Sequence, residues 1–416
     1  MVVLGCLTFP SATSGSPVPE NLVFPTSSLT SGNCSGATTP PSNPDLLLLS
    51  PQSSLPSVPS LHNCSPDNPN VSAGTASYVT FSTKTPYGAV HALAASANCV
   101  FAGTTALLRF PNAGDLSESE TLAVTSAGGA IKSIAPSGGR LFTAHQDGKI
   151  RVWEHAGPKR FRRVATLPTI SDRAFRFLLP RNHVQVRRHH TSLWIKHVDV
   201  VSALAIRGGL LYSASWDRTL KVWRVSDFRC LESVRAHDDA INALAVSAEG
   251  TVYTGSADTR IKIWARPAGR KKHSLVATLE KHRSAVNALA LSSDGSVLYS
   301  GACDRSILVW EKEGGAGVMA VTGALRGHKH AVLCLAYASE LLISGSADQT
   351  IRIWRRGVDN QYSTVAVLEG HERPIKSLVV APTEPTSESV LIYSGSLDGV
   401  IKVWRVWQPW NALTKN

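Results

Sequence analysis

The sequence predicts an all-β fold, a β-propeller in which seven four-stranded sheets close into a ring. One 14-residue pattern recurs along the chain, with a hydroxyl residue ten positions and an aspartate six positions before a tryptophan. A second pattern, a short strand of the form Val/Ile-x-Ala/Ser/Cys-Leu/Ile-Ala or close to it, occurs seven times. All but the first of the intervals between the repeated aspartates measure 41 to 50 residues, which suits blades of four short strands.

The tryptophan pattern predicts a β-hairpin in six of the seven blades. Its clearest copy is LLISGSADQTIRIW, which begins at Leu341. Each half alternates and is rich in β-forming residues, and the turn between the halves contains the aspartate, as expected for two antiparallel strands. The other five copies begin at Arg140, Leu210, Thr251, Val297 and Leu391.

The second pattern predicts the inner strand of every blade. Its seven copies begin at Ala89, Ala130, Val200, Ala240, Ala285, Ala331 and Pro374. Blade 1 is degenerate, because its hairpin turn is short and lacks the aspartate, and Phe110 stands where the other blades have tryptophan. Blade 2 retains Thr143, Asp147 and Trp153, but Ala127 stands where a histidine is expected.

Blades 3 to 7 each carry a histidine, a hydroxyl residue, an aspartate and a tryptophan at matching positions. We expect the indole N–H to donate to the hydroxyl, the hydroxyl to contact the imidazole and the imidazole to contact the aspartate, so that every buried polar atom has a partner. The combination resembles a hydrolase triad, but an enzyme needs one such set and this chain has five. The sets are therefore predicted to be structural: His197, Ser213, Asp217 and Trp223; His237, Thr254, Asp258 and Trp264; His282, Ser300, Asp304 and Trp310; His328, Ser344, Asp348 and Trp354; His371, Ser394, Asp398 and Trp404.

The two ends of the propeller are predicted to pair with each other. Residues 76–82, ASYVTFS, form a strand with no neighbour in sequence, and the last blade has no outer strand after Trp404. Pairing these two would close the ring and remove both free edges. The propeller would then span residues 76–416.

Residues 1–75 are predicted to form a disordered tail. The tract is rich in serine, threonine and proline, and residues 1–83 contain no lysine or arginine, so the net charge of +12 comes from the propeller. Such a composition buries too little apolar surface to offset the entropy of ordering. Within it, DLLLLS from Asp45 is either a short docking motif or an isolated apolar run.

The sequence favours a cytoplasmic or nuclear location. No run of 18 apolar residues is present, which predicts that no helix spans a membrane. The start, MVVLGCLTFP, lacks the basic residues of a signal peptide. Seven cysteines without Cys-x-x-Cys spacing predict neither a disulfide framework nor a zinc site.

A basic insertion is predicted at about residues 168–196, between blades 2 and 3. From Leu167 to His197 the chain advances 30 positions, whereas the matching step from Leu279 to His282 takes 3. From residue 154 to residue 196, ten basic residues stand against two acidic ones, with aromatic residues between them. We expect an ordered elaboration that packs on blades 2 and 3 and has a basic outer side.

This part of the chain carries the runs ATLPTISDRAFRF and PRNHVQVRRHHTSLWIKH, followed closely by VSALAIRGGLLYSASWDRTLKVWR. It resembles the Jingubang-like proteins, a plant group of WD-repeat proteins, and the likeness extends over the propeller. The resemblance implies a seven-bladed WD-repeat β-propeller and a non-catalytic regulator of pollen germination and pollen tube growth that works through protein partners. It implies no cofactor.

The face that carries the aspartate turns is the predicted partner-binding surface. Trp216 and Leu397 directly precede a turn aspartate, and aromatic anchors dominate many interfaces; an alternative is that Trp216 packs beneath the insertion. Basic residues would favour a protein with an acidic or peptide-like docking segment, such as a transcription regulator. They follow the histidines or lie in the insertion: Arg283, Lys329, His330, Arg373, Arg187 and Arg188.

Other functions remain as alternatives. Basic clusters with aromatic residues meet the electrostatic criterion for nucleic acid or phosphoinositide binding, but no known nucleic-acid module is present. A ubiquitin-ligase substrate receptor is less well supported, because the WDxR pattern is absent after the strand tryptophans. An enzyme is disfavoured, because the sequence has no phosphate-binding glycine loop, metal cluster or unique acid/base pair. We expect a monomeric propeller.

Overall fold

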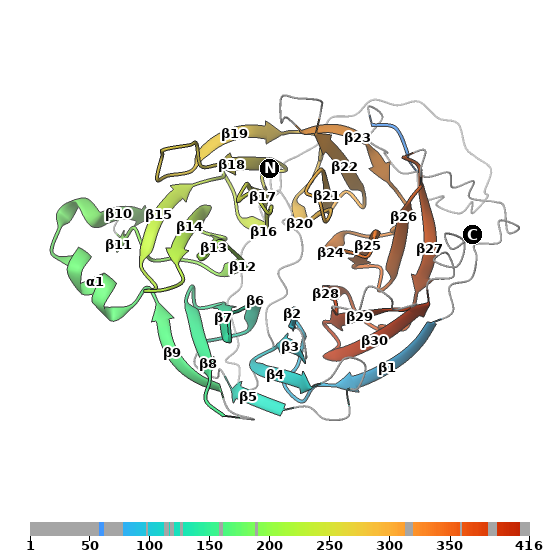
Figure 1. The fold of residues 1–416 in the computed structure, drawn as a ribbon, viewed down its shortest axis with the longest axis horizontal. Coiled ribbons are helices and arrows are strands. Elements are labelled where there is room, and N and C mark those ends of the chain that lie inside the picture. The colour runs from blue at the N-terminus through green and yellow to red at the C-terminus, as the bar shows by residue number, and fades with distance from the viewer. Residues whose placement is uncertain are drawn as a thin grey trace, which may run out of the picture. The chain divides into compact units, whose positions relative to one another are not determined.

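The computed structural model describes residues 58–61, 78–96, 99–111, 116, 120–124, 128–157, 161–187, 190–312, 319–357, 360–381 and 389–407. Within these residues the strands form seven four-stranded antiparallel sheets and one two-stranded hairpin. The seven sheets surround a central axis in Figure 1. The predicted seven-bladed β-propeller is therefore confirmed.

In the first six blades the four strands follow one another in the sequence, and the innermost strand comes first. The last blade also begins with its innermost strand, but its outer strand comes from the segment before the first blade. Blades 1 and 2 contain β2 (Ala92–Ser96), β3 (Cys99–Gly103), β4 (Ala106–Pro111) and β5 (Glu120–Val124), then β6 (Ile131–Ser137), β7 (Arg140–His145), β8 (Ile150–His155) and β9 (Phe161–Leu167). Blades 3 and 4 contain β12 (Val201–Arg207), β13 (Leu210–Ser215), β14 (Thr219–Arg224) and β15 (Cys230–Arg235), then β16 (Ile241–Val246), β17 (Val252–Ser256), β18 (Ile261–Ala265) and β19 (Ser274–Leu279). Blades 5 and 6 contain β20 (Val286–Leu291), β21 (Val297–Ala302), β22 (Ile307–Lys312) and β23 (Met319–Leu325), then β24 (Val332–Ala338), β25 (Leu341–Ser346), β26 (Ile351–Arg356) and β27 (Tyr362–Leu368). Blade 7 contains β28 (Ile375–Val380), β29 (Ser389–Ser396), β30 (Val400–Trp407) and β1 (Tyr78–Lys84).

The first and last strands close the ring, as predicted. β1 pairs antiparallel with β30, and Thr80 lies opposite Trp404 in the register. The Tyr78 ring also contacts the Trp404 ring, with centroids 5.8 Å apart. Because β30 is held on both sides, the last blade has no exposed edge at this strand.

The core lies between neighbouring blades. One apolar cluster joins Ile351 and Leu368 of blade 6 to Ile392 and Trp404 of blade 7. The blades approach so closely at the inner strands that a Cβ on Gly255 would lie only 2.7 Å from Val286 Cγ1 of the next blade. Close packing of this kind makes the ring a stiff support for its loops.

The insertion is ordered and projects from the outer rim of the ring beside blade 3 (Figure 1). It contains α1 (Ile170–Phe177), the 3-10 turn η1 (Pro180–Asn182) and a hairpin of β10 (His183–Arg187) and β11 (His190–Leu193). On α1 the exposed side is mainly apolar, and Arg173 is the basic residue exposed on this helix. The exposed apolar side chains of α1 include Phe175 and Phe177, because Asp172 and Arg176 turn inward and bind β15.

Four residues of the predicted tail contact the propeller. Leu61 donates its N–H to the Ala324 carbonyl at 3.1 Å and accepts from the Tyr362 N–H at 3.0 Å, so the segment joins β23 to β27. Val58 is buried, and these apolar residues explain why a polar, proline-rich tract is held here. The rest of residues 1–75, including DLLLLS, lies outside the described residues.

Candidate protein-interaction face

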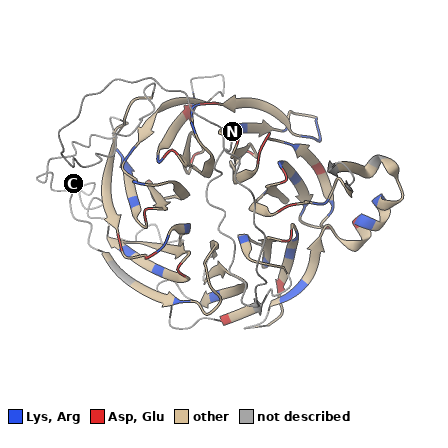
Figure 2. Ribbon diagram, turned by 180° about the vertical axis from the view of Figure 1, so that it is seen from behind, with Lys and Arg blue, Asp and Glu red and all other residues tan. Residues whose placement is uncertain are grey.

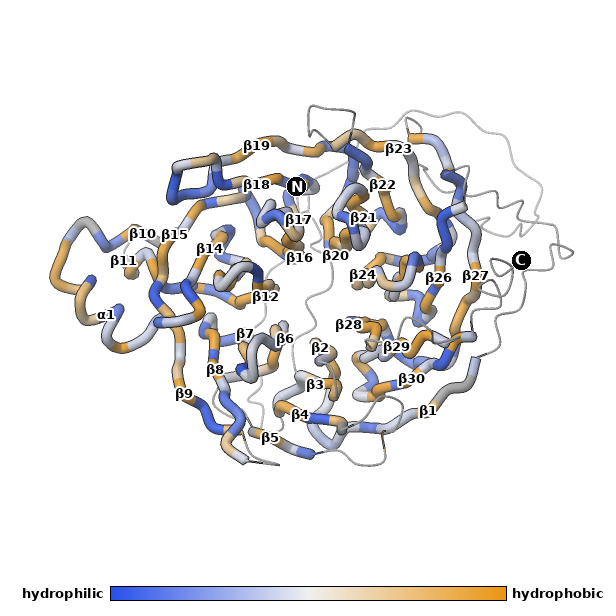
Figure 3. Tube along the Cα trace, viewed as in Figure 1, coloured by the Kyte–Doolittle hydropathy of each residue, from blue (hydrophilic) through white to orange (hydrophobic). Residues whose placement is uncertain are grey.

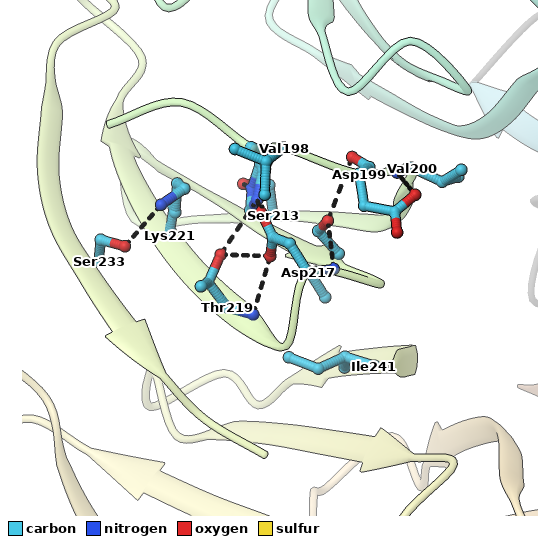
Figure 4. Close-up of polar contacts among 12 residues, drawn as sticks. Val198, Asp199, Val200, Ser213, Asp217, Thr219, Lys221, Ser233 and Ile241 are labelled. Atoms are coloured by element: carbon cyan, nitrogen blue, oxygen red, sulfur yellow. Dashed lines mark hydrogen bonds and ion pairs between the residues drawn. The ribbon is translucent and has the colours of Figure 1, made fainter. Parts of the chain in front are cut away.

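The four repeated side chains connect to one another in blade 3, where Figure 4 shows Ser213 and Asp217 among their polar neighbours. Trp223 Nε1–H donates to Ser213 Oγ at 2.9 Å, and this oxygen lies 2.8 Å from Nε2 of His197. Nδ1 of His197 lies 2.9 Å from Asp217 Oδ2. An indole only donates and an ionised carboxylate only accepts. The Nδ1–H must therefore donate to Asp217, and when the imidazole is neutral Ser213 donates to Nε2.

The structure brings the same four side chains together in each of blades 3 to 7. The indole nitrogen lies 2.8–3.0 Å from the hydroxyl oxygen, and this oxygen lies 2.7–2.8 Å from the imidazole Nε2. The imidazole Nδ1 lies 2.8–3.3 Å from the aspartate. The five hydroxyl residues are fully buried. A substrate could not reach these hydroxyls, which supports a structural role for the five sets.

The environment of these sets fixes their protonation. Burial alone would raise the pKa of Asp258, but the hydrogen bond and charge of His237 outweigh it and lower the pKa to about 2. Burial lowers the pKa of three of the imidazoles, those of His197, His328 and His371. These directions of the pKa favour a neutral imidazole beside an ionised aspartate, the state in which Ser213 donates to Nε2 of His197.

Blade 2 brings a different histidine, His145, to its hydroxyl, which was not predicted from the sequence. Thr143 accepts from Trp153 Nε1–H at 2.9 Å and lies 2.8 Å from Nε2 of His145. Asp147 instead pairs with Arg151, whose Nη2 lies 2.7 Å away. His145 stands two positions after the hydroxyl residue, where blades 3 to 7 have serine or alanine. This difference between blade 2 and the other blades could have identified His145 from the sequence.

The turn aspartates also hold the loops at one end of blades 3 to 7. In each blade the aspartate Oδ2 accepts from the backbone N–H of the residue after the histidine, at 2.8–3.3 Å. These five residues are all exposed: Val198, Asp238, Arg283, Lys329 and Glu372. With the residues that follow them, Asp199, Asp239, Ser284, His330 and Arg373, they form what we call the top face.

The top face has an acidic half and a basic half. Asp199, Asp238 and Asp239 are exposed over blades 3 and 4. Arg283, Lys329 and His330 are exposed over blades 5 and 6. Figure 2 shows acidic and basic segments distributed around the turns of the ring. The four predicted basic residues of this face, Arg373 included, are therefore accessible, and the acidic half was not foreseen.

The residues that precede the turn aspartates are less accessible than the sequence suggested. Trp216 and Leu397 are each half-buried, and their backbone N–H groups donate to Val200 and Pro374. Cys303 occupies the same position in blade 5 and is disulfide-bonded, which the scattered cysteines did not predict. The other described cysteines are free: Cys99, Cys230 and Cys334.

The two basic residues predicted for the insertion cannot be placed on a site. Arg187 ends β10, and nothing is described of its side chain, while Arg188 lies outside the described residues. Among the residues that are described, no group of three or more histidine, cysteine, aspartate or glutamate side chains could hold a metal ion. None of the described helices is long and apolar enough to cross a membrane.

Six segments of the chain match the family model described as "WD domain, G-beta repeat", and together they cover more than half of the sequence. They are residues 119–154, 182–224, 228–265, 273–311, 319–355 and 362–405. The chain belongs to this WD-repeat family. Each matched segment from 228–265 onward begins with the outer strand of one blade and ends in the third strand of the next. Blade 1 is outside the matches except for its outer strand, in keeping with its degenerate sequence.

Curated relatives share the repeats over part of their length. Mitochondrial division protein 1 of Schizosaccharomyces pombe is 29% identical over 223 residues, 47% of this chain and 27% of that protein. Protein Notchless of Drosophila melanogaster is 29% identical over 172 residues, 41% of this chain and 33% of that protein. Probable cytosolic iron-sulfur protein assembly protein 1 of Pyricularia oryzae is 38% identical over 72 residues, 17% of this chain and 16% of that protein. This chain thus spans a third or less of the length of each of these relatives.

Proposed function

We propose that this WD-repeat protein is a non-catalytic scaffold that binds a protein partner on its top face. The observation that carries the proposal is the charged surface formed by the loops after the five histidines, whose backbone the turn aspartates hold in place. A preorganised surface costs less entropy on binding than a mobile one. The buried hydroxyls argue against catalysis at the five sets.

The basic half of the top face favours an acidic stretch of the partner. Arg283 and Lys329 are exposed on neighbouring blades, and His330 lies beside them. Complementary charge speeds association and selects among partners. The resemblance to the Jingubang-like proteins supports a role as a plant regulator of pollen germination and pollen tube growth, acting in the cytoplasm or nucleus.

A comparative pull-down tests this function. The full chain, the variant Arg283→Glu/Lys329→Glu and the control Lys271→Glu/Lys272→Glu are each used to capture proteins from plant tissue. Lys271 and Lys272 are exposed in the loop between β18 and β19, at the opposite end of the blades, so the control makes the same change in charge elsewhere. Circular dichroism first establishes that all three are folded.

We expect specific proteins to be captured by the wild type and the control and lost from the top-face variant. Equal capture by all three would overturn the assignment of the top face. Salt-sensitive binding of DNA or phosphoinositide vesicles, lost on neutralising Arg187 and Arg188, would favour the anionic-ligand alternative instead. Loss of a ubiquitin-ligase subunit from the top-face variant would favour a substrate receptor.

A further inference from the structure

The helix of the insertion, α1, buries a charged side chain and exposes its apolar side. Its polar residue Asp172 is buried, at 5% exposure, whereas Ile170 is 77%, Phe175 81%, Phe177 63% and Leu178 81% exposed. A helix on the surface of a globular protein normally buries its apolar side and exposes its charges. Within the described part of the chain the apolar side of α1 is therefore largely uncovered, although the Phe177 ring contacts the His183 ring with centroids 5.7 Å apart.

Polar contacts with blade 3 hold α1 in this orientation. Asp172 Oδ2 accepts from the Cys230 N–H at 3.2 Å, and Arg176 Nη2 donates to the Cys230 carbonyl at 3.0 Å. The same two side chains bind each other, with Arg176 Nε 2.8 Å from Asp172 Oδ1. The Arg176 guanidinium also lies over the Trp194 ring, 4.5 Å from a ring centroid. Rotating α1 to bury its apolar side would break all of these contacts.

Further apolar side chains extend the surface beyond α1. Leu179 and Val184 are 42% and 44% exposed. Six of the twelve large apolar side chains that are exposed in the described residues thus lie between residues 170 and 184. Figure 3 shows that this projection outside the ring contains hydrophobic segments. Apolar surface gathered in one exposed patch, unlike scattered single residues, marks an interaction site.

The exposed charges nearest to this patch in the sequence are positive. Arg162, Arg163, Arg173 and Lys196 are exposed. Asp172, the one acidic residue between positions 161 and 196, is buried and paired with Arg176. A second copy of the chain would bring a positive rim against a positive rim, so like charges oppose self-association through this patch.

The geometry also disfavours a membrane as the occupant. A helix that lies in a membrane surface presents its polar side to the lipid headgroups while its apolar side enters the acyl region. The polar side of α1 is instead occupied by the edge of β15 through Asp172 and Arg176. A protein partner does not need a free polar side on α1, because the partner can itself supply both the apolar contacts and the flanking charges.

We infer that the apolar side of α1 is a docking surface for an amphipathic helix of a protein partner that carries acidic side chains along its edges. Ile170, Phe175, Phe177 and Leu178 supply the apolar contacts, and Arg173 supplies a charge at the rim. Helices that dock in this way bury the residues of one face. The inference rests on the proposed scaffold function but uses a surface separate from the top face.

The test uses a labelled helical peptide of about 15 residues, roughly four turns, with leucines on one face and glutamates beside them. The full chain is titrated with this peptide, with a scrambled peptide and with a version that has lysines in place of the glutamates. The key variant is Phe175→Ser/Leu178→Ser, and Arg173→Glu tests the charge. The matched control is Leu275→Ser/Val276→Ser, which alters two apolar residues that are 47% and 55% exposed on β19.

We expect the wild type and the control to bind the acidic peptide, and Phe175→Ser/Leu178→Ser to bind it about tenfold more weakly or worse. Arg173→Glu should weaken binding and reduce its dependence on salt. Equal binding of the acidic, scrambled and lysine peptides, or binding that survives the serine changes, overturns the inference. The inference is also overturned if the wild type binds anionic vesicles or self-associates and the serine changes abolish that binding or self-association. If Arg283→Glu/Lys329→Glu still binds the peptide, the two surfaces are independent, and each can fail without the other.

Discussion

Nε2 of His145 lies 2.8 Å from the Thr143 hydroxyl, two residues along the same strand. In blades 3 to 7 the equivalent hydroxyl is reached by a histidine from the preceding turn. Blade 2 therefore keeps the same contact between imidazole and hydroxyl but takes its histidine from a different part of the chain. The Trp153 indole N–H donates to the same hydroxyl, at 2.9 Å.

Replacing His145 should destabilise blade 2. His145→Ser introduces the residue found at this position in four other blades, but it leaves the Thr143 hydroxyl without the imidazole and opens a cavity. We expect a loss of about 1–3 kcal/mol in the free energy of unfolding, measured by urea denaturation. His155→Ser changes an exposed histidine in the same blade and should stay within about 0.5 kcal/mol. Equal losses in both variants would contradict the role assigned to His145.

Trp223 should contribute through both packing and its hydrogen bond. The side chain is 1% exposed and its indole N–H donates to Ser213. Trp223→Ala should cost about 3–5 kcal/mol through the cavity it leaves, whereas Trp223→Phe keeps a ring and should cost about 1–2 kcal/mol, mainly for the hydrogen bond. Denaturant midpoints of the two variants decide this. If the two losses are the same, the packing contribution has been overestimated.

The five repeated sets predict a fall in stability with acid. Burial holds the pKa values of His197, His328 and His371 below that of a free imidazole, which is about 6.5. Below that pH the unfolded chain binds more protons than the folded chain, so the free energy of unfolding decreases. Asp258, whose pKa is about 2 in the fold, adds a further loss below its unfolded value of about 3.9. The melting temperature should be nearly constant from pH 8 to 7 and should then decline; a constant value down to pH 5 would contradict this account.

Spacing alone predicted most of the ring, because each blade repeats the same contacts. The ten-residue step from Ser213 to Trp223 suffices to place both side chains in one set, and the unpaired strand at residues 76–82 was enough to predict the closure with β30. The sequence could not predict which side of α1 faces the propeller. The run ISDRAFRFLL contains both apolar and charged residues, and nothing in its composition indicates that Asp172 and Arg176 turn inward toward the Cys230 backbone. That choice depends on the free edge of β15, which belongs to another part of the chain.

Closure of the ring by β1 should be essential to the fold. A deletion of residues 1–84 would leave β30 with an unpaired edge and expose Trp404, which is now fully buried. We expect this variant to aggregate or to unfold at a much lower temperature, since exposed edges favour association. A deletion of residues 1–56 keeps β1 and should melt close to the wild type in differential scanning calorimetry. Similar melting of the two deletions would show that β1 is dispensable.

The contact between Leu61 and Gly323 should control whether residues 58–61 stay on the propeller. A Cβ on Gly323 would collide with the Leu61 side chain. Gly323→Val should therefore displace residues 58–61 and leave the strands of the ring in place. The N–H groups of Leu61 and Tyr362 would lose their acceptors and exchange with solvent faster in hydrogen-exchange mass spectrometry. Ala320→Val enlarges a partly buried residue on the same strand and should leave both amides protected. Protection that persists in Gly323→Val would mean that the segment can shift along β23 while keeping its backbone hydrogen bonds.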